Sequence, residues 1–435
     1  MSNLLINGGK KLTGDLTVHS AKNSAVAILC ASVMIDGQVV LTDVPEIEEV
    51  NRILEVLESI GAKIKRSKNK ITLDYSGKID ISKLDKKSAE KTRSAFLLWG
   101  ALASKIKKYT FPKIGGCKLG NRTVRPHIYA LEKLGVNIKS TPSCYEVINN
   151  DLKGNEIVMY ESGDTTTENV IMAAVMASGK TVIKMASSNY QVQDLCYFLI
   201  KAGAKISGIG TTTLYITGVK NLKTNVVYPL MPDPIVAMTY LSAGITTKSH
   251  LTVKNCPLDF LELELEKLSV MGQKYIIKNR RKSANKKFNI VDIEIFPSVL
   301  KALPDKIYGR PFPGLNIDNL PLFVPILTQA KGRTLVHDWA YENRAVYYLE
   351  LQKLGANITL LDPHRVWVEG PVKLKANEVI SPSALRPAVN VLICMLAASG
   401  KSILRNTYMI ERGYENLYEV LNKAGADITV IKSEE

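Results

Sequence analysis

The chain has 435 residues, 46% of them hydrophobic and 23% charged, with a formal net charge of +16 at pH 7. This balance is typical of a globular protein, and the length exceeds one ordinary core, so we expect at least two domains. The longest apolar runs, 25–35 and 389–398, fall short of the roughly 20 residues that a membrane span needs, and no signal-type stretch precedes Lys10, which predicts a cytoplasmic protein.

Near the N-terminus, a strand is predicted over 16–18 and a helix of small residues from Ala25. Between them lies the segment His19-Ser-Ala-Lys22-Asn23-Ser. A lysine beside amide and hydroxyl groups at a helix start can hold an anion, because the helix N-terminus carries partial positive charge. Taken alone, such a segment is more often a solvated turn.

One phrase recurs along the chain: leucine, two residues, an apolar residue, glycine, and then isoleucine three residues after the glycine. Its glycines are Gly61, Gly135, Gly203, Gly355 and Gly425, and a degraded copy ends at Gly272. The phrase predicts the last turn of an amphipathic helix, a glycine in the left-handed conformation, and the start of a strand. A helix rich in small residues followed by a strand accompanies each copy, as in 173–183 and 392–404.

The repeat predicts six βαβαβ-like units of roughly 70 residues, each too small to be stable alone. Three units in each of two domains is the natural partition, with the small-residue helices inside and the glycine-capped helices outside. We place the boundaries at 20–231 for one domain and at 1–19 plus 232–435 for the other. The catalytic surface is expected in the cleft between the two.

The segment 113–122, Lys-Ile-Gly-Gly-Cys117-Lys-Leu-Gly-Asn-Arg122, is the most unusual in the chain. Neighbouring cations favour the thiolate of a cysteine, and the glycines give the loop conformational freedom. We therefore interpret Cys117 as a functional residue. The other five cysteines are read as small hydrophobic residues in a reducing compartment, and their spacing predicts no metal site: Cys30, Cys144, Cys196, Cys256 and Cys394.

The segment 278–287 is the one true basic cluster, and it lies between two strand-like stretches without interleaved aromatic residues. It is predicted to be an exposed hairpin tip, with polyanion binding as the minor alternative. We expect no nucleic-acid partner, because the lysines come with neither a known module nor a stacking surface.

The C-terminal half contributes arginines at the ends of predicted elements, and the planar guanidinium suits carboxylate and phosphate groups. They are Arg344, Arg386 and Arg412. Asp318 stands before a small-residue helix, where it could be an N-cap. Each of these residues alone is better explained as a surface ion pair or a helix cap.

Taken together, the motifs from Lys22-Asn23 through Gly115-Gly-Cys117-x-x-Gly-x-Arg122 to Arg412-Gly-Tyr414 resemble the UDP-N-acetylglucosamine enolpyruvyl transferase family over nearly all 435 residues. The resemblance implies an α/β fold of two inside-out α/β barrels, each built from three repeats. It implies transfer of the enolpyruvyl group of phosphoenolpyruvate to a nucleotide hydroxyl, without cofactor or metal.

For phosphoenolpyruvate, the resemblance implies that Lys22 and Arg122 bind the phosphate, while Arg412 faces the reacting group. Arg344 and Arg386 would hold the carboxylate. These fixed cations supply electrostatic stabilisation where charge develops.

The remaining implied roles concern proton transfer and the acceptor. Asp318 would take the proton from the acceptor hydroxyl, and Cys117 would protonate the methylene carbon, form an adduct with phosphoenolpyruvate, or do both. Further residues are assigned to substrate binding by the same resemblance: Asn23, Arg93, Arg125 and Thr167.

On the acceptor side the chain departs from the family pattern. Arg125 stands where the family has an aspartate near the uracil, and Asp164 lies in the stretch that normally contacts the diphosphate. The family's Pro-Glu-Ile-Val-Asp reads Tyr-Gln-Val-Gln-Asp over 190–194, and two further changes place Ala384 before Leu385-Arg386 and Pro234 after Asp233.

Two explanations of these departures remain open: drift in a cell-wall enzyme, or a paralogue with another nucleotide acceptor such as uridine monophosphate. UDP-N-acetylglucosamine is the acceptor that we expect from the resemblance. A catalytically idle binding homologue is a third hypothesis, which the complete set of catalytic matches disfavours.

Overall fold

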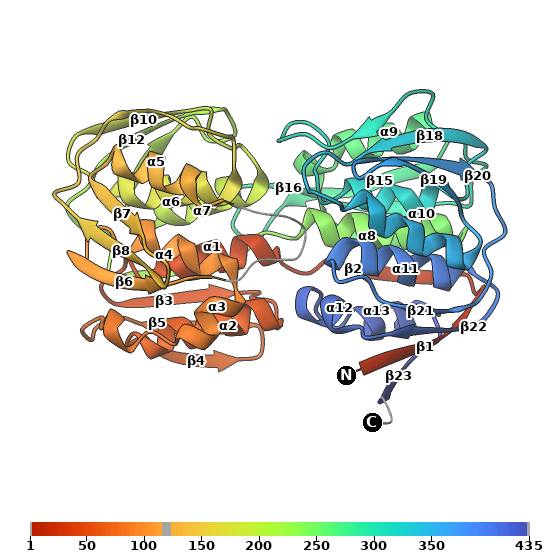
Figure 1. The fold of residues 1–435 in the computed structure, drawn as a ribbon, viewed down its shortest axis with the longest axis horizontal. Coiled ribbons are helices and arrows are strands. Elements are labelled where there is room, and N and C mark those ends of the chain that lie inside the picture. Colours follow the sequence, from red (N-terminus) through yellow and green to blue (C-terminus); the bar gives the residue numbers. More distant parts are fainter. Residues whose placement is uncertain (1, 115–122, 433–435) are drawn as a thin grey trace. The chain divides into compact units, whose positions relative to one another are not determined.

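The computed structural model describes residues 2–114 and 123–432. Their contacts divide the chain into two compact units (Figure 1). The N-terminal unit comprises residues 20–114 and 123–231, and the C-terminal unit comprises residues 2–19 and 232–432. Each unit contains three small sheets and an inner group of helices, so the predicted repeat of six is confirmed.

The sheets of the N-terminal unit consist of eleven strands. In spatial order they are β13 (Asn225–Pro229), β3 (Gln38–Thr42), β5 (Lys70–Asp74) and β4 (Lys63–Ser67); β6 (Lys108–Pro112), β8 (Cys144–Asn149) and β7 (Val136–Ser140); and β11 (Lys205–Ser207), β12 (Thr213–Thr217), β10 (Lys180–Lys184) and β9 (Glu156–Val158).

The C-terminal unit has three four-stranded sheets. They are β21 (Glu378–Ile380), β22 (Gly400–Arg405), β1 (Ser2–Gly8) and β23 (Ile428–Lys432); β15 (Tyr275–Lys282), β16 (Asn289–Ile295), β14 (His250–Pro257) and β2 (Thr13–Thr17); and β17 (Ile307–Tyr308), β18 (Gly332–His337), β20 (Arg365–Gly370) and β19 (Asn357–Asp362).

Five of the six sheets share one pairing scheme, in which one edge strand is parallel to its neighbour and the other pairs are antiparallel. Within the described residues, the sheet of β6, β8 and β7 has only the antiparallel part. The common scheme explains why one sequence phrase recurs, since each copy builds the same turn from helix to strand.

The predicted left-handed glycines are confirmed at every copy of the phrase. Gly61, Gly135, Gly203, Gly272, Gly355 and Gly425 all have φ between 84° and 115°. Side chains rarely adopt this conformation, whereas glycine does so without a steric penalty. Even the degraded copy at Gly272 follows this rule, because it ends helix α9 (Glu262–Val270) before β15.

The inner helices of the C-terminal unit are α8 (Pro234–Thr246), α10 (Phe323–Leu327) and α11 (Leu385–Ala397), which pack on one another. All thirteen residues of α8 are buried, as its apolar and small residues on every side require. Around them lie α9, the 3-10 helix η5 (Ala345–Leu354), α12 (Tyr408–Gly413) and α13 (Leu417–Lys423).

The N-terminal unit repeats this plan with the inner helices α1 (Lys22–Ser32), α4 (Leu98–Ala101) and α6 (Asp164–Val175). The other helices of this unit are α2 (Glu48–Ser59), α3 (Lys86–Lys91), α5 (Arg125–Glu132) and α7 (Tyr190–Lys201). Burial of α1 and α6 confirms that the small-residue helices lie inside.

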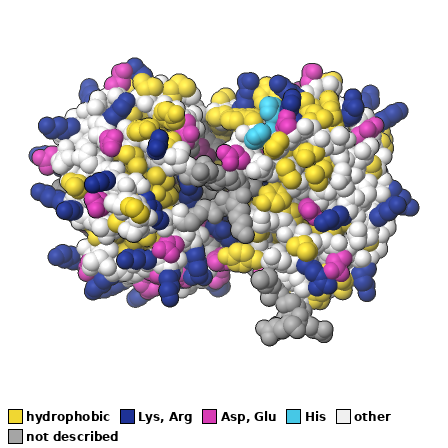
Figure 2. Space-filling view, in the orientation of Figure 1, with side chains coloured by type: hydrophobic (Ala, Val, Ile, Leu, Met, Phe, Trp, Pro, Cys, Tyr) yellow, Lys and Arg dark blue, Asp and Glu magenta, His cyan; other side chains and the backbone are white. Residues whose placement is uncertain are grey.

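The basic segment forms the hairpin of β15 and β16, as predicted. Two of its cations are paired: Arg281 with the buried Asp292 at 2.9 Å, and Lys278 with Glu294 at 2.5 Å. On the face shown in Figure 2, lysine and arginine side chains are spread over the surface among acidic ones.

Four of the five described cysteines are buried, and Cys144 is half-buried. No helix of the described chain has the length and apolar character to cross a bilayer.

Candidate active site

The C-terminal unit brings together Asp318, Arg344 and Arg386, although they are far apart in the sequence. Asp318 precedes the 3-10 helix η4 (Leu320–Leu322), and Arg386 is the second residue of α11. Arg344 directly precedes η5. One carboxylate oxygen of Asp318 lies 3.5 Å from Nη1 of Arg344, and the other lies 3.8 Å from Nη2 of Arg386.

Arg344 is almost fully buried, with 1% of its surface exposed. Its Nε and Nη2 donate to the two oxygens of Asp338 at 2.6 and 2.7 Å, and Nη2 also donates to the Ile317 carbonyl at 2.6 Å. Burial opposes the charge of Arg344, but the adjacent Asp338 carboxylate outweighs it and raises the pKa of the guanidinium. Nη1 is thus the nitrogen directed towards Asp318.

Asp338 is the partner that the sequence analysis missed. It follows β18, is fully buried, and accepts a further hydrogen bond from the Tyr348 hydroxyl at 2.5 Å. This fixed pair positions the arginine rigidly, because a bidentate guanidinium–carboxylate contact allows little rotation. No local pattern marks Asp338, since an aspartate after a strand is usually a turn residue.

Arg386 is 7% exposed, and its Nη1 donates to the Tyr414 hydroxyl at 2.7 Å. That hydroxyl also lies 2.7 Å from the Thr239 hydroxyl of α8, so Tyr414 joins α8 to α11. The neighbouring Gly413 lets α12 lie close to α11, because a Cβ at this position would meet Cδ2 of Leu385 at 2.4 Å. Arg412 lies in the last turn of α12, immediately before Gly413.

In the N-terminal unit, the predicted anion-binding residues begin helix α1. The Nζ of Lys22 lies 2.6 Å from the Glu49 carboxylate, and both side chains are mostly buried, at 14% and 13% exposed. The Asn23 amide donates to the Tyr190 hydroxyl at 2.9 Å. Glu49 on α2 and Tyr190 on α7 therefore hold the start of α1.

Asp164 begins α6, and its carboxylate is paired within the unit. It accepts hydrogen bonds from the Ser187 hydroxyl at 2.5 Å and from the Asn189 amide at 2.9 Å. Thr167 is fully buried, and its hydroxyl donates to the Gly163 carbonyl and accepts from the Ser187 amide. Thr167 is one of the residues predicted to bind substrate, and its hydrogen bonds join the start of α6 to the loop that leads into α7.

Arg93 donates to the Thr123 carbonyl at 3.0 Å, and Arg125 is the exposed first residue of α5. His127 is buried against aromatic rings, and its Nδ1 accepts from Asn169 at 2.9 Å. Burial and the Arg93 charge lower the pKa of His127 to about 3, so the ring is neutral. Cys117 and Arg122 lie outside the described residues.

Glu168 on α6 is a fully buried carboxyl group, with one oxygen bound by the Gln191 amide at 3.0 Å. Burial, reinforced by Asp164, raises the pKa of Glu168 to about 8. The native state therefore holds a proton that the unfolded state releases above about pH 4.5. The stabilisation that comes from this bound proton is complete below about pH 4.5, and it is lost as the pH rises through about 8.

We accordingly expect Glu168→Gln to weaken the fall in melting temperature between pH 5 and pH 8.5. The glutamine is neutral throughout, so it loses no proton as the pH rises. Glu132→Gln, at an exposed position on α5, is the control and should follow the native curve. Parallel curves for Glu168→Gln and the native protein would contradict the assignment of a buried neutral acid.

In the C-terminal unit, the Asp318 carboxylate thus lies within 4 Å of two buried arginines. A sequence profile described as EPSP synthase (3-phosphoshikimate 1-carboxyvinyltransferase) matches residues 6–421. The chain belongs to this family of enolpyruvyl transferases.

Relatives extend over the full length. The chain is 34% identical over 433 residues to UDP-N-acetylglucosamine 1-carboxyvinyltransferase 2 of Caldanaerobacter subterraneus subsp. tengcongensis, covering 99% of this chain and 100% of the relative. It is 33% identical to the UDP-N-acetylglucosamine 1-carboxyvinyltransferase of Treponema denticola, with coverage of 98% and 99%. The enolpyruvyl transferase NikO from Streptomyces tendae has the same fold, with a TM-score of 0.87 at 22% identity and 99% of both chains covered.

Proposed function

We propose that the enzyme transfers the enolpyruvyl group of phosphoenolpyruvate to the 3-hydroxyl of UDP-N-acetylglucosamine, the first step of peptidoglycan precursor synthesis. The observation that supports this most is the placing of Asp318 within 4 Å of Arg344 and Arg386. Such a cluster offers a proton acceptor beside fixed positive charge. The named function of the full-length relatives supports the choice of acceptor.

In this proposal the acceptor oxygen attacks C2 of phosphoenolpyruvate as Asp318 takes its proton. C3 gains a proton from Cys117, which gives a tetrahedral ketal that still carries phosphate. In the second step C3 gives up a proton and the bond from C2 to the phosphate oxygen breaks, which restores the double bond. Lys22 and Arg122 bind the phosphate and Arg412 faces the reacting group. Arg344 and Arg386 hold the carboxylate.

Phosphate release from phosphoenolpyruvate in the presence of single acceptors tests the proposal directly. We expect release with UDP-N-acetylglucosamine and none with shikimate 3-phosphate. Release with uridine monophosphate alone would favour a second candidate, the same chemistry on another nucleotide. That candidate is motivated by Asp164 and Tyr190, which lie among the acceptor-side departures. Absence of release with every acceptor would contradict both.

Cys117→Ser is expected to abolish covalent labelling by fosfomycin, an epoxide that mimics phosphoenolpyruvate. The cationic, glycine-rich sequence around Cys117 favours a reactive thiolate, while the buried thiols of Cys30 and Cys196 have raised pKa values and stay protonated. Intact-mass spectrometry should show one adduct on the native protein and none on the variant. The control is Cys196→Ser, which fosfomycin should label to the same extent as the native protein.

The negative charge of Asp164 should affect how tightly the acceptor binds. Ser187 and Asn189, two of its hydrogen-bond donors, are neutral side chains that orient the carboxylate. A diphosphate at about 4 Å would be repelled by about 4 kcal/mol at an effective dielectric of 20. We therefore expect Asp164→Asn to bind UDP-N-acetylglucosamine more tightly, by at least tenfold in calorimetry. Equal affinities would mean that the carboxylate does not face the diphosphate.

A further inference from the structure

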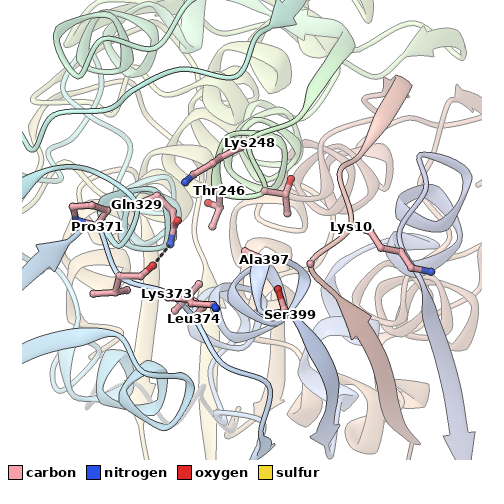
Figure 3. A pocket seen from close by; sticks show the side chains of 12 residues that line it. Lys10, Thr246, Lys248, Gln329, Pro371, Lys373, Leu374, Ala397 and Ser399 are labelled. Atoms are coloured by element: carbon pink, nitrogen blue, oxygen red, sulfur yellow. Dashed lines mark hydrogen bonds between the residues drawn. The ribbon is translucent and has the colours of Figure 1, made fainter.

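A pocket lies in the C-terminal unit, at the opposite end of the inner helices from Asp318 and Arg386. It has a volume of about 380 Å³ and is lined by residues at the carboxyl ends of α8, α10 and α11 and in the loops after β1 and β20 (Figure 3). Because α11 has thirteen residues, the pocket is roughly 18 Å along the helix from Arg386.

Three lysines line this pocket, namely Lys10, Lys248 and Lys373. Lys10 is paired with Asp427 at 2.6 Å. Lys248 and Lys373 form no ion pair with any residue of the described ranges 2–114 and 123–432. In Figure 3, Gln329 lies between these two lysines. The pocket is therefore positively charged.

Lysines near helix carboxyl ends often serve the terminal carbonyl groups, but here backbone amides already serve them. The amide of Gly9 donates to Leu396 of α11 at 2.8 Å, and the amide of Val372 donates to Thr328 after α10 at 2.9 Å. At the end of α8, the amide of Ser249 donates to Gly244 at 2.8 Å. The ammonium groups of Lys248 and Lys373 are not needed for this purpose.

Thr246, the last residue of α8, gives independent evidence for a ligand. It is 1% exposed, it lines the pocket, and its hydroxyl has no hydrogen-bond partner within the described residues. The next residue shows the usual arrangement, since the Thr247 hydroxyl donates to the Ala243 carbonyl at 2.7 Å. Buried hydroxyl groups nearly always have a partner, so the Thr246 hydroxyl is available to donate to an acceptor in the pocket.

We propose that this pocket binds a phosphate group, as inorganic phosphate or as a small phosphate monoester. The ammonium groups of Lys248 and Lys373 hold its charge, and the Thr246 hydroxyl donates to one oxygen. Val372 and Leu374 provide an apolar wall for the carbon part of an ester. The inference does not depend on the proposed reaction, because none of these residues belongs to the candidate active site.

Residue-resolved acetylation tests the site on the full-length protein. Lysine modification is measured by mass spectrometry at rising concentrations of inorganic phosphate or glycerol 3-phosphate, against sodium chloride of equal ionic strength. We expect saturable protection of Lys248 and Lys373 by at least threefold. Lys423, an exposed lysine at the end of α13, and Lys286 of the basic hairpin should remain unprotected.

Thr246→Val should raise the half-protecting phosphate concentration several-fold, whereas Thr429→Val, at an exposed position on β23, should leave it unchanged. Stronger protection by glycerol 3-phosphate than by inorganic phosphate would identify an ester as the ligand, and the reverse would identify the free ion. The proposal would be overturned if chloride protected Lys248 and Lys373 as well as phosphate does, or if phosphate protected Lys423 equally. It would also be overturned if Thr246→Val left the half-protecting phosphate concentration unchanged.

Discussion

Arg344→Ala is expected to lower the free energy of unfolding of the C-terminal unit by about 3–5 kcal/mol. The substitution leaves Asp338 fully buried with a negative charge, and the Tyr348 hydroxyl alone cannot compensate for it. Removing one partner of a buried ion pair is far more destabilising than removing both, because the remaining charge loses both water and counterion. Urea unfolding followed by circular dichroism measures the change.

Two further variants separate this explanation from a general effect of losing an arginine. Arg405→Ala removes an exposed ion pair with Glu378, which water screens, and should change stability far less than Arg344→Ala does. The double variant Arg344→Leu/Asp338→Leu should recover part of the loss, because no buried charge remains. A double variant that is less stable than Arg344→Ala would show that packing, and not the orphaned carboxylate, dominates.

Asp318→Asn is expected to reduce kcat for phosphate release by about 10²–10⁴-fold, the range typical of removing a general base. The amide has the shape of the carboxylate but cannot accept the hydroxyl proton at neutral pH. Because Asp318 is only partly buried, at 24% exposed, and its arginine contacts are 3.5 and 3.8 Å, we expect little change in stability.

Asp305→Asn, an exposed aspartate of the same unit, is the matched control and should retain native activity. Turnover within threefold of the native rate would remove Asp318 from the proposed role.

The architecture was largely predictable because it depends on local features that repeat. Each glycine phrase specifies a helix end, a left-handed residue and a strand start within eight residues, and all six such glycines have positive φ. The buried helices were equally visible, since runs such as α8 are apolar or small on every side. The sheet pairings agree with that repeat in five of six cases.

Residues of the candidate site were predictable only as far as family motifs name them. The sequence indicated Arg344, but not that Asp338 occupies the Nε–Nη2 edge of its guanidinium, because this contact depends on how the residue after β18 meets the residue before η5. Likewise, the sequence indicated Asp164 as a departure from the family pattern, but not its bonds to Ser187 and Asn189, which arise from the packing of α6 against α7. Tertiary partners of polar residues leave no periodic signal in the sequence.

The position of β1 has a consequence for the order in which the protein can fold during synthesis. This strand lies between β22 and β23, so that Leu4 pairs with both Leu404 and Val430 (Figure 1). Every strand and inner helix of the N-terminal unit is translated before β22 and β23 exist, which lets that unit fold first on the ribosome. Until then β1 has both edges unpaired, and such edges invite pairing with other chains. Chaperone protection of the nascent chain would therefore matter most for the first strand translated.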